Sequence, residues 1–179
     1  MIPGLRAVRL VITDVDGVLT SGLIPMDAAG RRMGFFSARD GMGATLAHQA
    51  GLHVAILSGA RSEALRARAE DLGIRWVREG ETDKAAGVRA LCAAVGCEPQ
   101  ESLYLGDDLN DIPAFRAAGI AVAVADAVPE LRALAHWVTQ AGGGAGAFRE
   151  VVDAVLHAQG TWERVVHELY GPLARSREP

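Results

Sequence analysis

The sequence predicts an α/β fold in which a parallel β-sheet is covered by helices. Two observations lead to this prediction. From residue 40 onward, short apolar segments alternate with segments of helical length, and a glycine follows each of the first four helical segments. Successive β-α units of this length connect through right-handed crossovers, which produce a parallel sheet with helices on its faces. The chain of 179 residues is half hydrophobic, so it can bury a sizeable core in a single domain.

The first predicted strand covers residues 8–13, which are rich in β-branched side chains and apolar at odd and even positions alike. This pattern is typical of a strand buried on both faces. Residues 18–37 lack a helical period, and within them residues 23–36 are predicted to form a projecting β-hairpin. Because a lone hairpin is barely stable, it either folds back on its own domain or docks on another subunit through its large apolar side chains, and we favour the subunit. These are Leu23, Ile24, Met26, Met33, Phe35 and Phe36.

The remaining elements alternate along the chain. Helices are predicted at residues 40–50, 62–72, 83–95, 111–118 and 148–157, and strands at 53–57, 74–77, 102–106, 120–124 and 136–139. Left-handed glycine caps are expected at the ends of the first four helices, at Gly51, Gly73, Gly96 and Gly119. Residues 1–160 are predicted to form one domain that includes the hairpin, and residues 161–179 a mobile C-terminal tail.

Composition argues against several classes of function. The net charge is −4 and the basic residues are not clustered, so nucleic acid is not an expected partner. The start of the chain lacks a signal-peptide pattern and no apolar run reaches membrane-spanning length, so we expect a cytoplasmic protein without a membrane partner. The spacing of Cys92 and Cys97 matches neither a redox pair nor a zinc site.

Two acids follow the first predicted strand directly. Asp14 and Asp16 stand at its carboxyl end, where open α/β sheets bind their ligands. Carboxylates are poor strand formers and are costly to bury without a partner. Mg²⁺, a hard ion that prefers carboxylate and carbonyl oxygen, is the simplest partner. An isolated D-x-D-G sequence is more often only a turn, so the interpretation depends on the other strands.

Further polar residues follow the later strands and point to the same edge of the sheet. Ser58 and Gly59 follow the second strand, and Lys84 begins the helix after the third. The fourth strand runs into Gly106, Asp107, Asp108, Asn110 and Asp111. Lys84 is also the only lysine beside 17 arginines, which suggests a position that needs a compact ammonium group. Each residue alone is commonly structural, but their joint placement at one edge indicates a site.

This set of residues suits phosphoryl transfer through a carboxylate nucleophile. Mg²⁺ held by Asp14, the main-chain carbonyl of Asp16 and Asp107 would offset the charge of a phosphate ester. Asp14 would attack phosphorus and form an aspartyl phosphate. Asp16 would protonate the leaving alkoxide and later take a proton from water.

The other residues of the set have supporting roles in this hypothesis. Ser58 and the amide of Gly59 would bind phosphate oxygens, and Lys84 would pair with both the phosphate and Asp14. Asp108 and Asp111 would lie outside the metal ligands and orient Lys84 or a metal-bound water.

The motifs resemble those of a known superfamily. Asp14 to Leu19, Ser58-Gly59, Lys84 and Gly106 to Asp111 are similar to the four motifs of haloacid dehalogenase (HAD) superfamily phosphatases. The resemblance extends to the 3-deoxy-D-manno-octulosonate 8-phosphate (KDO8P) phosphatase family. It is carried by Arg39-Asp40-Gly41, Arg68-Ala69 before Leu72-Gly73-Ile74, Val122 to Ala127 and Gly143 to Glu150. It covers about residues 8–160.

The resemblance implies a Rossmann-like three-layer domain without a cap, a homotetramer, dependence on Mg²⁺ and a role in lipopolysaccharide biosynthesis. It also implies that the hairpin helps to cover a neighbouring subunit's active site, and that the substrate is an acidic sugar phosphate. The residues implied to bind substrate are Asp16, Ser37, Ala38, Arg39, Asp40, Gly41, Gly59, Arg61, Arg68 and Lys84.

Two positions depart from the family pattern. Ala60 and Thr45 stand where family members usually carry arginine, and Arg61 is a candidate to replace the first of these. A guanidinium group suits the carboxylate of an acidic sugar, so the departures concern the sugar and not the phosphatase chemistry. A nine-carbon sugar acid 9-phosphate or another phosphorylated metabolite is therefore an alternative substrate.

Two alternatives belong to another class of function. A receiver-like signalling module also uses Asp, a hydroxyl and Lys on a parallel sheet, but Asp16 two residues after Asp14 favours turnover over a lasting aspartyl phosphate. A non-catalytic regulatory domain is the other alternative, and the full set of predicted catalytic groups argues against it.

Overall fold

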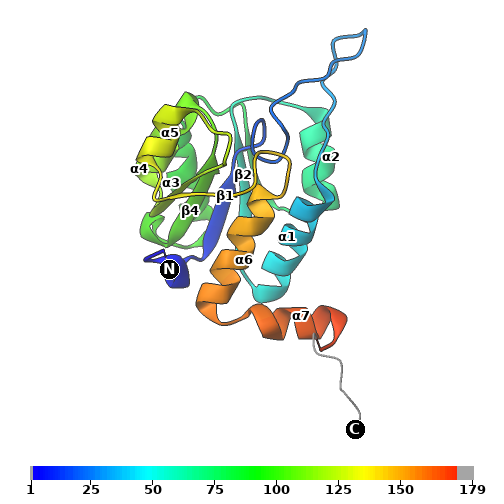
Figure 1. Ribbon diagram of the computed structural model, residues 1–179. Helices are drawn as coiled ribbons and strands as arrows, with labels where there is room; N and C mark the ends of the chain where they lie inside the picture. Colours follow the sequence, from blue (N-terminus) through cyan, green and yellow to red (C-terminus); the bar gives the residue numbers. More distant parts are fainter. Residues whose placement is uncertain (1, 173–179) are drawn as a thin grey trace.

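The computed structural model describes residues 2–172 and is built around a six-stranded sheet (Figure 1). The strands are β1 (Leu10–Thr13), β2 (His53–Ser58), β3 (Trp76–Glu79), β4 (Ser102–Gly106), β5 (Ile120–Ala123) and β6 (Trp137–Val138). Their order is β3-β2-β1-β4-β5-β6, and all neighbouring strands run parallel. The predicted parallel sheet is confirmed.

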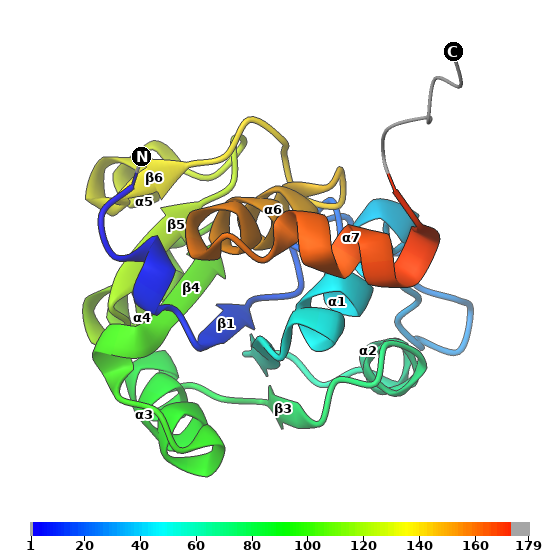
Figure 2. The same ribbon diagram turned by 90° about the horizontal axis from the view of Figure 1, so that it is seen from below.

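Helices cover both faces of the sheet. They are α1 (Ala38–Ala50), α2 (Glu63–Asp71), α3 (Lys84–Val95), α4 (Ile112–Ala117), α5 (Pro129–Leu134), α6 (Ala147–Gln159) and α7 (Trp162–Tyr170). Short 3-10 helices lie at η1 (Leu5–Ala7), η2 (Pro99–Glu101) and η3 (Leu109–Asp111). Figure 2 shows α1, α2, α6 and α7 on one face and α3, α4 and α5 on the other. This is the expected three-layer arrangement.

The strand order creates a crevice beside β1. From β1 the chain crosses to β2 and β3 on one side, and it later returns to β4, β5 and β6 on the other. In an open parallel sheet, ligands bind at the carboxyl ends of the strands where the order reverses in this way. All four residues of β1 are buried, as the apolar pattern predicts, so Asp14 leaves the core directly into this crevice.

Glycines end three helices as predicted, but the fourth acts differently. Gly51, Gly73 and Gly96 have φ values of 77°, 66° and 78°, which side chains with a Cβ atom disfavour. Gly119 does not have a positive φ, so its predicted role as a left-handed cap is wrong. Its Cα lies against the main chain of Gln100, where a Cβ atom would overlap the carbonyl group. Glycine is needed there for close packing.

The projecting segment between β1 and α1 is less regular than predicted. Its only β-bridge pairs Met26 with Arg32, and the turn at its tip is closed by a hydrogen bond from the Gly30 amide to the Asp27 carbonyl. Figure 1 shows this segment extending away from the sheet. It is a short loop and not a folded cap domain, in agreement with the expectation of a cap-less fold.

Five of the six apolar side chains predicted to be exposed on the projecting segment are exposed. Leu23 is 76% and Phe35 is 74% exposed, and Ile24, Met26 and Met33 are also exposed. Phe36 differs, because its ring packs against the core and lies 5.8 Å from the guanidinium of Arg68.

Two helices were not predicted. Helix α5 is short, begins with Pro129 and buries only Leu131. Helix α7 lies within the predicted tail 161–179, so that prediction is wrong for residues 162–170; residues 173–179 lie outside the described part of the chain. Val165 and Val166 of α7 are buried, and the helix packs on α1 and α6. Within residues 2–172, the helices are too short and too polar to cross a lipid bilayer.

We expect Val165→Ala to lower the free energy of unfolding by about 1–3 kcal/mol, because it removes methyl groups from a fully buried position on α7. Urea denaturation followed by circular dichroism measures this change. Glu163→Ala, on the exposed side of the same helix, should change stability by less than about 0.5 kcal/mol. Near-zero effects of both substitutions would show that α7 does not contribute to the core.

Candidate active site

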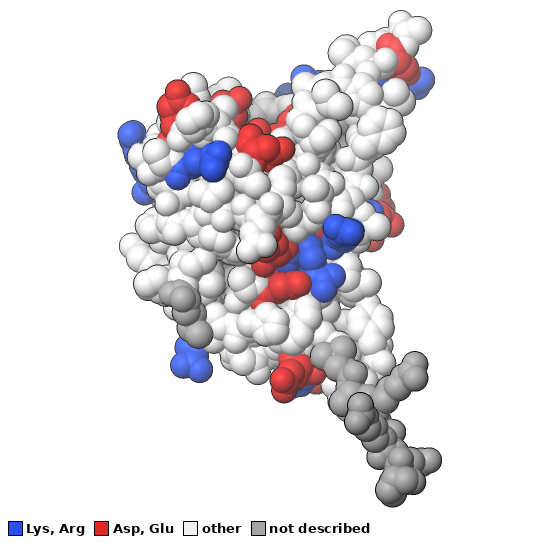
Figure 3. Space-filling model, in the orientation of Figure 1, with Lys and Arg blue, Asp and Glu red and all other residues white. Residues whose placement is uncertain are grey.

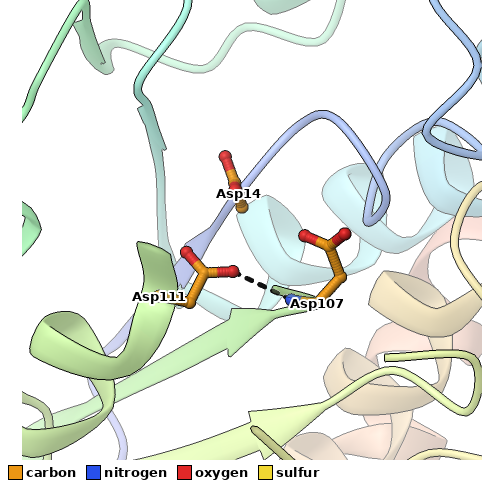
Figure 4. A group of neighbouring side chains, drawn as sticks. All are labelled: Asp14, Asp107 and Asp111. Atoms are coloured by element: carbon orange, nitrogen blue, oxygen red, sulfur yellow. Dashed lines mark hydrogen bonds between the residues drawn. The ribbon is translucent and has the colours of Figure 1, made fainter. Parts of the chain in front are cut away.

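Three carboxylates meet at the carboxyl ends of β1 and β4. Oxygen atoms of Asp14, Asp107 and Asp111 all lie within 4.8 Å of one another (Figure 4). The pairing of the two strands causes this meeting, because Thr13 is in register with Leu105 and each strand then ends beside the other. The acids that the sequence placed at one edge of the sheet are therefore brought together.

Asp14 is 5% exposed and is held by two donors. The main-chain amide of Val15 donates to Oδ1 at 2.7 Å, and the ammonium of Lys84 donates to Oδ2 at 2.6 Å. These contacts hold the carboxylate in one orientation at the floor of the crevice.

Lys84 reaches Asp14 from the first residue of α3, which the side chain of Asp83 caps by accepting from the amide of Ala86. The lysine is 2% exposed, and its Nζ also donates to Asp111 Oδ1 at 2.5 Å. A lysine buried this deeply is stable only when it is paired and hydrogen-bonded. The one lysine of the chain thus connects carboxylates from two separate segments.

Asp111 is fully buried, and protein donors occupy both of its oxygens. Oδ1 accepts from Lys84 and from the hydroxyl of Tyr104 at 2.7 Å, while Oδ2 accepts from the amide of Asp107 at 2.8 Å. Asp111 thus holds Lys84 and the Asp107 loop in place. The sequence hypothesis gave Asp108 and Asp111 the role of orienting Lys84 or a metal-bound water, and among these two acids Asp111 is the one that contacts Lys84. Tyr104 was not anticipated, since a tyrosine in an apolar strand gives no signal of a polar contact.

The carboxylates of this group are electrostatically unbalanced. Burial, together with the charge of Asp111, raises the pKa of Asp14 to about 7 despite the opposing effect of Lys84. Burial and the neighbouring charges of Asp111 and Asp14 raise the pKa of Asp107 to about 7. Burial opposes protonation of Lys84, but the two carboxylates outweigh it, so its pKa is raised and it stays charged.

The donor set fits a hard divalent cation. Asp14, Asp107 and Asp111 together carry more negative charge than Lys84 can offset. Oxygen atoms of carboxylates are the ligands that Mg²⁺ prefers. Each oxygen of Asp111 accepts from two protein donors, whereas each oxygen of Asp14 accepts from only one. Asp14 and Asp107 are therefore the carboxylates best able to offer an oxygen to a metal.

The acids open into a cleft of about 420 Å³. Arg32 and Asn110 line its wall, together with most of the residues that the sequence analysis assigned to the reaction. These residues are Asp14, Asp16, Ser58, Gly59, Asp107 and Asp108. Lys84 lies behind Asp14, outside the lining. The size of the cleft is suitable for a small metabolite.

Two features shape the wall of the cleft near Asp16. Gly17 has a φ of 86°, and a Cβ atom there would overlap the carboxylate of Asp107, so only glycine lets this carboxylate approach. The Asp16 side chain is 40% exposed, and its Oδ2 lies 3.5 Å from the guanidinium of Arg32. Arg32 was not among the predicted site residues, because its sequence position in the projecting segment carries no catalytic motif.

Ser58, another lining residue, ends β2 and is buried, and its Oγ accepts from the amide of Ala60 at 3.2 Å. Around Gly59 a Cβ atom would meet only the carbonyl of Glu81, at 3.8 Å, so this backbone is open to the cleft. Asp108 caps η3 by accepting from the amide of Leu109 at 2.7 Å.

Most of the residues implied to bind substrate lie outside this cleft. Five of them stand at the start of α1 and do not line the cleft: Ser37, Ala38, Arg39, Asp40 and Gly41. Ser37 caps the helix by accepting from the amide of Arg39, and Asp40 accepts from the amide of Arg149 at the start of α6. Their contacts within the chain are therefore structural.

Arg61 and Arg68 also point elsewhere. Arg61 lies against Gly80, where its Nε would crowd an added Cβ atom. Arg68 donates to the carbonyl of Ser37 at 3.2 Å and to Asp71 at 2.6 Å. Neither arginine lines the cleft of its own chain.

Comparison with known proteins gives consistent matches. Residues 48–146 match the family described as haloacid dehalogenase-like hydrolase. The 3-deoxy-D-manno-octulosonate 8-phosphate phosphatase of Yersinia pestis is 44% identical over 152 residues, which are 85% of this chain and 81% of that protein. The phosphatase of the same name from Haemophilus influenzae is 42% identical over 156 residues, or 87% of each chain.

Solved structures match over similar lengths. The crystal structure of the Yersinia pestis phosphatase has a TM-score of 0.88 at 42% identity and covers 90% of this chain and 88% of its own. The phosphatase of the same name from Moraxella catarrhalis, in complex with magnesium ion, phosphate ion and a KDO molecule, has a TM-score of 0.89 at 32% identity, covering 93% and 95%.

We expect affinity for Mg²⁺ to rise about 10- to 100-fold between pH 6 and pH 8. The pKa values of Asp14 and Asp107 are raised to about 7, so protons occupy these carboxylates at pH 6 and compete with the metal. At pH 8 both carboxylates are mostly ionised and are available to bind the cation. Isothermal titration calorimetry with MgCl₂ at the two pH values measures the change.

Asp107→Asn should weaken Mg²⁺ binding and flatten its pH dependence. Asp153→Asn, which removes a carboxylate from α6 away from the cleft, serves as the control and should leave the affinity unchanged. An affinity for Mg²⁺ that is the same at pH 6 and pH 8 would contradict the assignment of these acids as its ligands.

Proposed function

The chain belongs to the HAD-like hydrolases and, within them, to the KDO8P phosphatase family, and from this we propose that it hydrolyses KDO8P to KDO and phosphate. The observation that carries the proposal is the buried contact of Lys84 with Asp14, at the floor of a cleft that also contains Asp16 and Asp107. This arrangement supplies a nucleophile, an acid and positive charge at one point.

Asp14 acts as the nucleophile. Its carboxylate oxygen attacks phosphorus, the bond from phosphorus to the ester oxygen breaks, and an aspartyl phosphate forms. Asp16 gives its proton to the departing alkoxide and then takes a proton from water. That water attacks phosphorus, the acyl phosphate bond breaks, and Asp14 and inorganic phosphate are released. The exposed position of Asp16 at the mouth of the cleft suits exchange of protons with the sugar and with water.

Lys84 and the end of β2 support the phosphoryl group. The ammonium of Lys84 keeps Asp14 oriented and offsets negative charge as it develops on the phosphoryl oxygens. Ser58 and the amide of Gly59, which both line the cleft, bind phosphate oxygens. Asp111 holds Lys84, and Asp108 holds the loop that carries Asp107 by capping η3.

Asp14, the main-chain carbonyl of Asp16 and Asp107 would hold Mg²⁺. When bound, the ion supplies positive charge that lets an anionic ester approach an anionic nucleophile. The raised pKa values of Asp14 and Asp107 support this role, because burial and neighbouring acids destabilise the ionised carboxylates and a bound cation would stabilise them. The Moraxella catarrhalis relative was crystallised with magnesium ion.

We further propose a homotetramer in the cytoplasm. The exposed Leu23 and Phe35 of the projecting segment support association, because apolar surface of this kind is stabilised by burial against another chain. A charged sugar phosphate does not cross membranes unaided, which supports a cytoplasmic location. On the face shown in Figure 3, acidic and basic side chains are mixed and form no extended basic patch.

We also propose that residues 37–41 at the start of α1, with Arg61 and Arg68, bind the substrate, as the family resemblance implies. Since these residues lie outside the cleft of their own chain, we propose that they contribute to substrate binding between subunits. A nine-carbon sugar acid phosphate stays the alternative substrate, because Ala60 in the cleft wall leaves space beside Gly59.

We expect Mg²⁺-dependent release of phosphate from KDO8P and at least about a 1,000-fold loss of kcat in Asp14→Asn, which lacks the nucleophile. Asp16→Asn should also lose most activity, because the leaving alkoxide is no longer protonated. A panel of sugar phosphates, assayed with Mg²⁺ and with EDTA, measures these effects. Asp153→Asn is the control that keeps activity. A stable phospho-enzyme with no turnover on any substrate would favour a signalling or regulatory domain instead.

We expect wild-type protein to run as a tetramer, and the double substitution Leu23→Ser with Phe35→Ser to produce smaller species. Both changes remove large apolar side chains that are more than 70% exposed in the single chain. Size-exclusion chromatography with light scattering measures the mass. Tyr170→Ser, an exposed position on α7, is the matched control and should stay tetrameric. A monomeric wild-type protein would contradict the proposal.

A further inference from the structure

The wall of the cleft has more acidic than basic side chains, and the proposed mechanism gives no role to its one basic residue. Four carboxylates line it, from Asp14, Asp16, Asp107 and Asp108. Among the described residues of its wall, Arg32 is the one lysine or arginine, since Lys84 lies behind Asp14 and is committed to Asp14 and Asp111. An acidic sugar phosphate brings a carboxylate besides its phosphate, so it needs a second cationic group in the cleft.

Arg32 stands on the sugar side of the reaction centre. Its guanidinium lies 3.5 Å from Oδ2 of Asp16, the group that meets the ester oxygen joining phosphate to sugar. Arg32 also lines a second hollow, between the projecting segment and α2, together with Leu23, Met33, Phe36 and Leu65. A sugar that leaves the phosphate position past Asp16 therefore meets Arg32 next.

The contact between Arg32 and Asp16 leaves donors free. Both side chains are about two-fifths exposed, at 39% and 40%, and one nitrogen of the guanidinium makes the single contact. An exposed ion pair of this kind contributes little to stability. An arginine carries five N–H donors in a planar fork, so most of the fork can bind a second carboxylate.

The backbone of Arg32 is held in place, although its side chain makes only the one contact with Asp16. Arg32 forms the isolated β-bridge with Met26, and the amide of the next residue, Met33, donates to the carbonyl of Pro25 at 2.9 Å. The neighbouring Arg31 instead turns toward the tip, where its Nε donates to Asp27 at 2.7 Å and its side chain is 75% exposed. Two adjacent arginines therefore differ in whether they face the cleft.

We propose that Arg32 is a specificity residue that binds the carboxylate of the sugar acid, with its own chain's projecting segment supplying the guanidinium. This inference rests on the proposed function, because it assigns a contact to the substrate of that reaction. The planar fork of Arg32 forms two parallel hydrogen bonds to the substrate carboxylate, while Asp16 remains beside the ester oxygen. A sugar phosphate without a carboxylate has no group for Arg32 to bind.

The test compares two substrates that differ in the carboxylate. KDO8P carries the carboxylate, and D-arabinose 5-phosphate is a neutral sugar with a terminal phosphate. We expect Arg32→Ala to raise KM for KDO8P about 10- to 100-fold with a much smaller change in kcat. The kcat/KM for D-arabinose 5-phosphate should stay within about twofold of wild type. Arg32→Lys should recover only part of the loss, since an ammonium cannot form the bidentate contact.

Arg31→Ala is the matched control on the adjacent residue and should leave both substrates unaffected. Equal losses for both substrates in Arg32→Ala, or a loss in kcat alone, would overturn the proposal, as would an equal effect of Arg31→Ala. Failure of the underlying function looks different, because wild-type protein would then release no phosphate from KDO8P. Light scattering of each variant checks that the assembly is unchanged.

Discussion

The buried contact of one lysine with two carboxylates organises this molecule. Lys84 at the start of α3 binds Asp14 at the end of β1 and Asp111 beside β4, and Tyr104 supports the same carboxylate from within β4. Removing one partner would leave an uncompensated charge in the core, which is strongly destabilising. The group therefore holds the crossovers on both sides of β1 in one arrangement, and at the same time it sets the orientation of Asp14, the proposed nucleophile.

The side chains of this group are held firmly by hydrogen bonds, but its carboxylates, together with Asp107, carry more negative charge than Lys84 offsets. The pKa values of Asp14 and Asp107 are raised because burial removes water and adjacent acids repel one another. The same imbalance makes the crevice attractive to a divalent cation and then to a phosphate ester, so the chemistry follows from charge that the fold leaves uncompensated. Farther out, Arg32 offsets the exposed Asp16 and leaves donors for the sugar. Positive charge is thus distributed along the path of the substrate.

Sequence reasoning was accurate where a local rule applies and failed where packing decided. The period of apolar residues located all six strands within two residues of their observed limits. The helices α5 and α7 were missed because each has few buried side chains and its position is stabilised by neighbouring helices. Gly119 resembles a helix cap in sequence, yet it is needed because the chain passes close to Gln100. The projecting segment is less paired than its ribbon pattern suggests, since only Met26 and Arg32 form a bridge.

By itself, the sequence determined the α/β class, the parallel sheet and the set of acids with one lysine at its carboxyl edge, because hydrophobic periodicity and motif spacing are local properties of the chain. Only the tertiary structure decided that Asp111 also holds the amide of Asp107, that Tyr104 joins the group, that Arg32 faces the cleft, and that the start of α1 lies outside it. These outcomes depend on contacts between residues far apart in the chain. Such contacts form from three-dimensional packing, which no local pattern encodes.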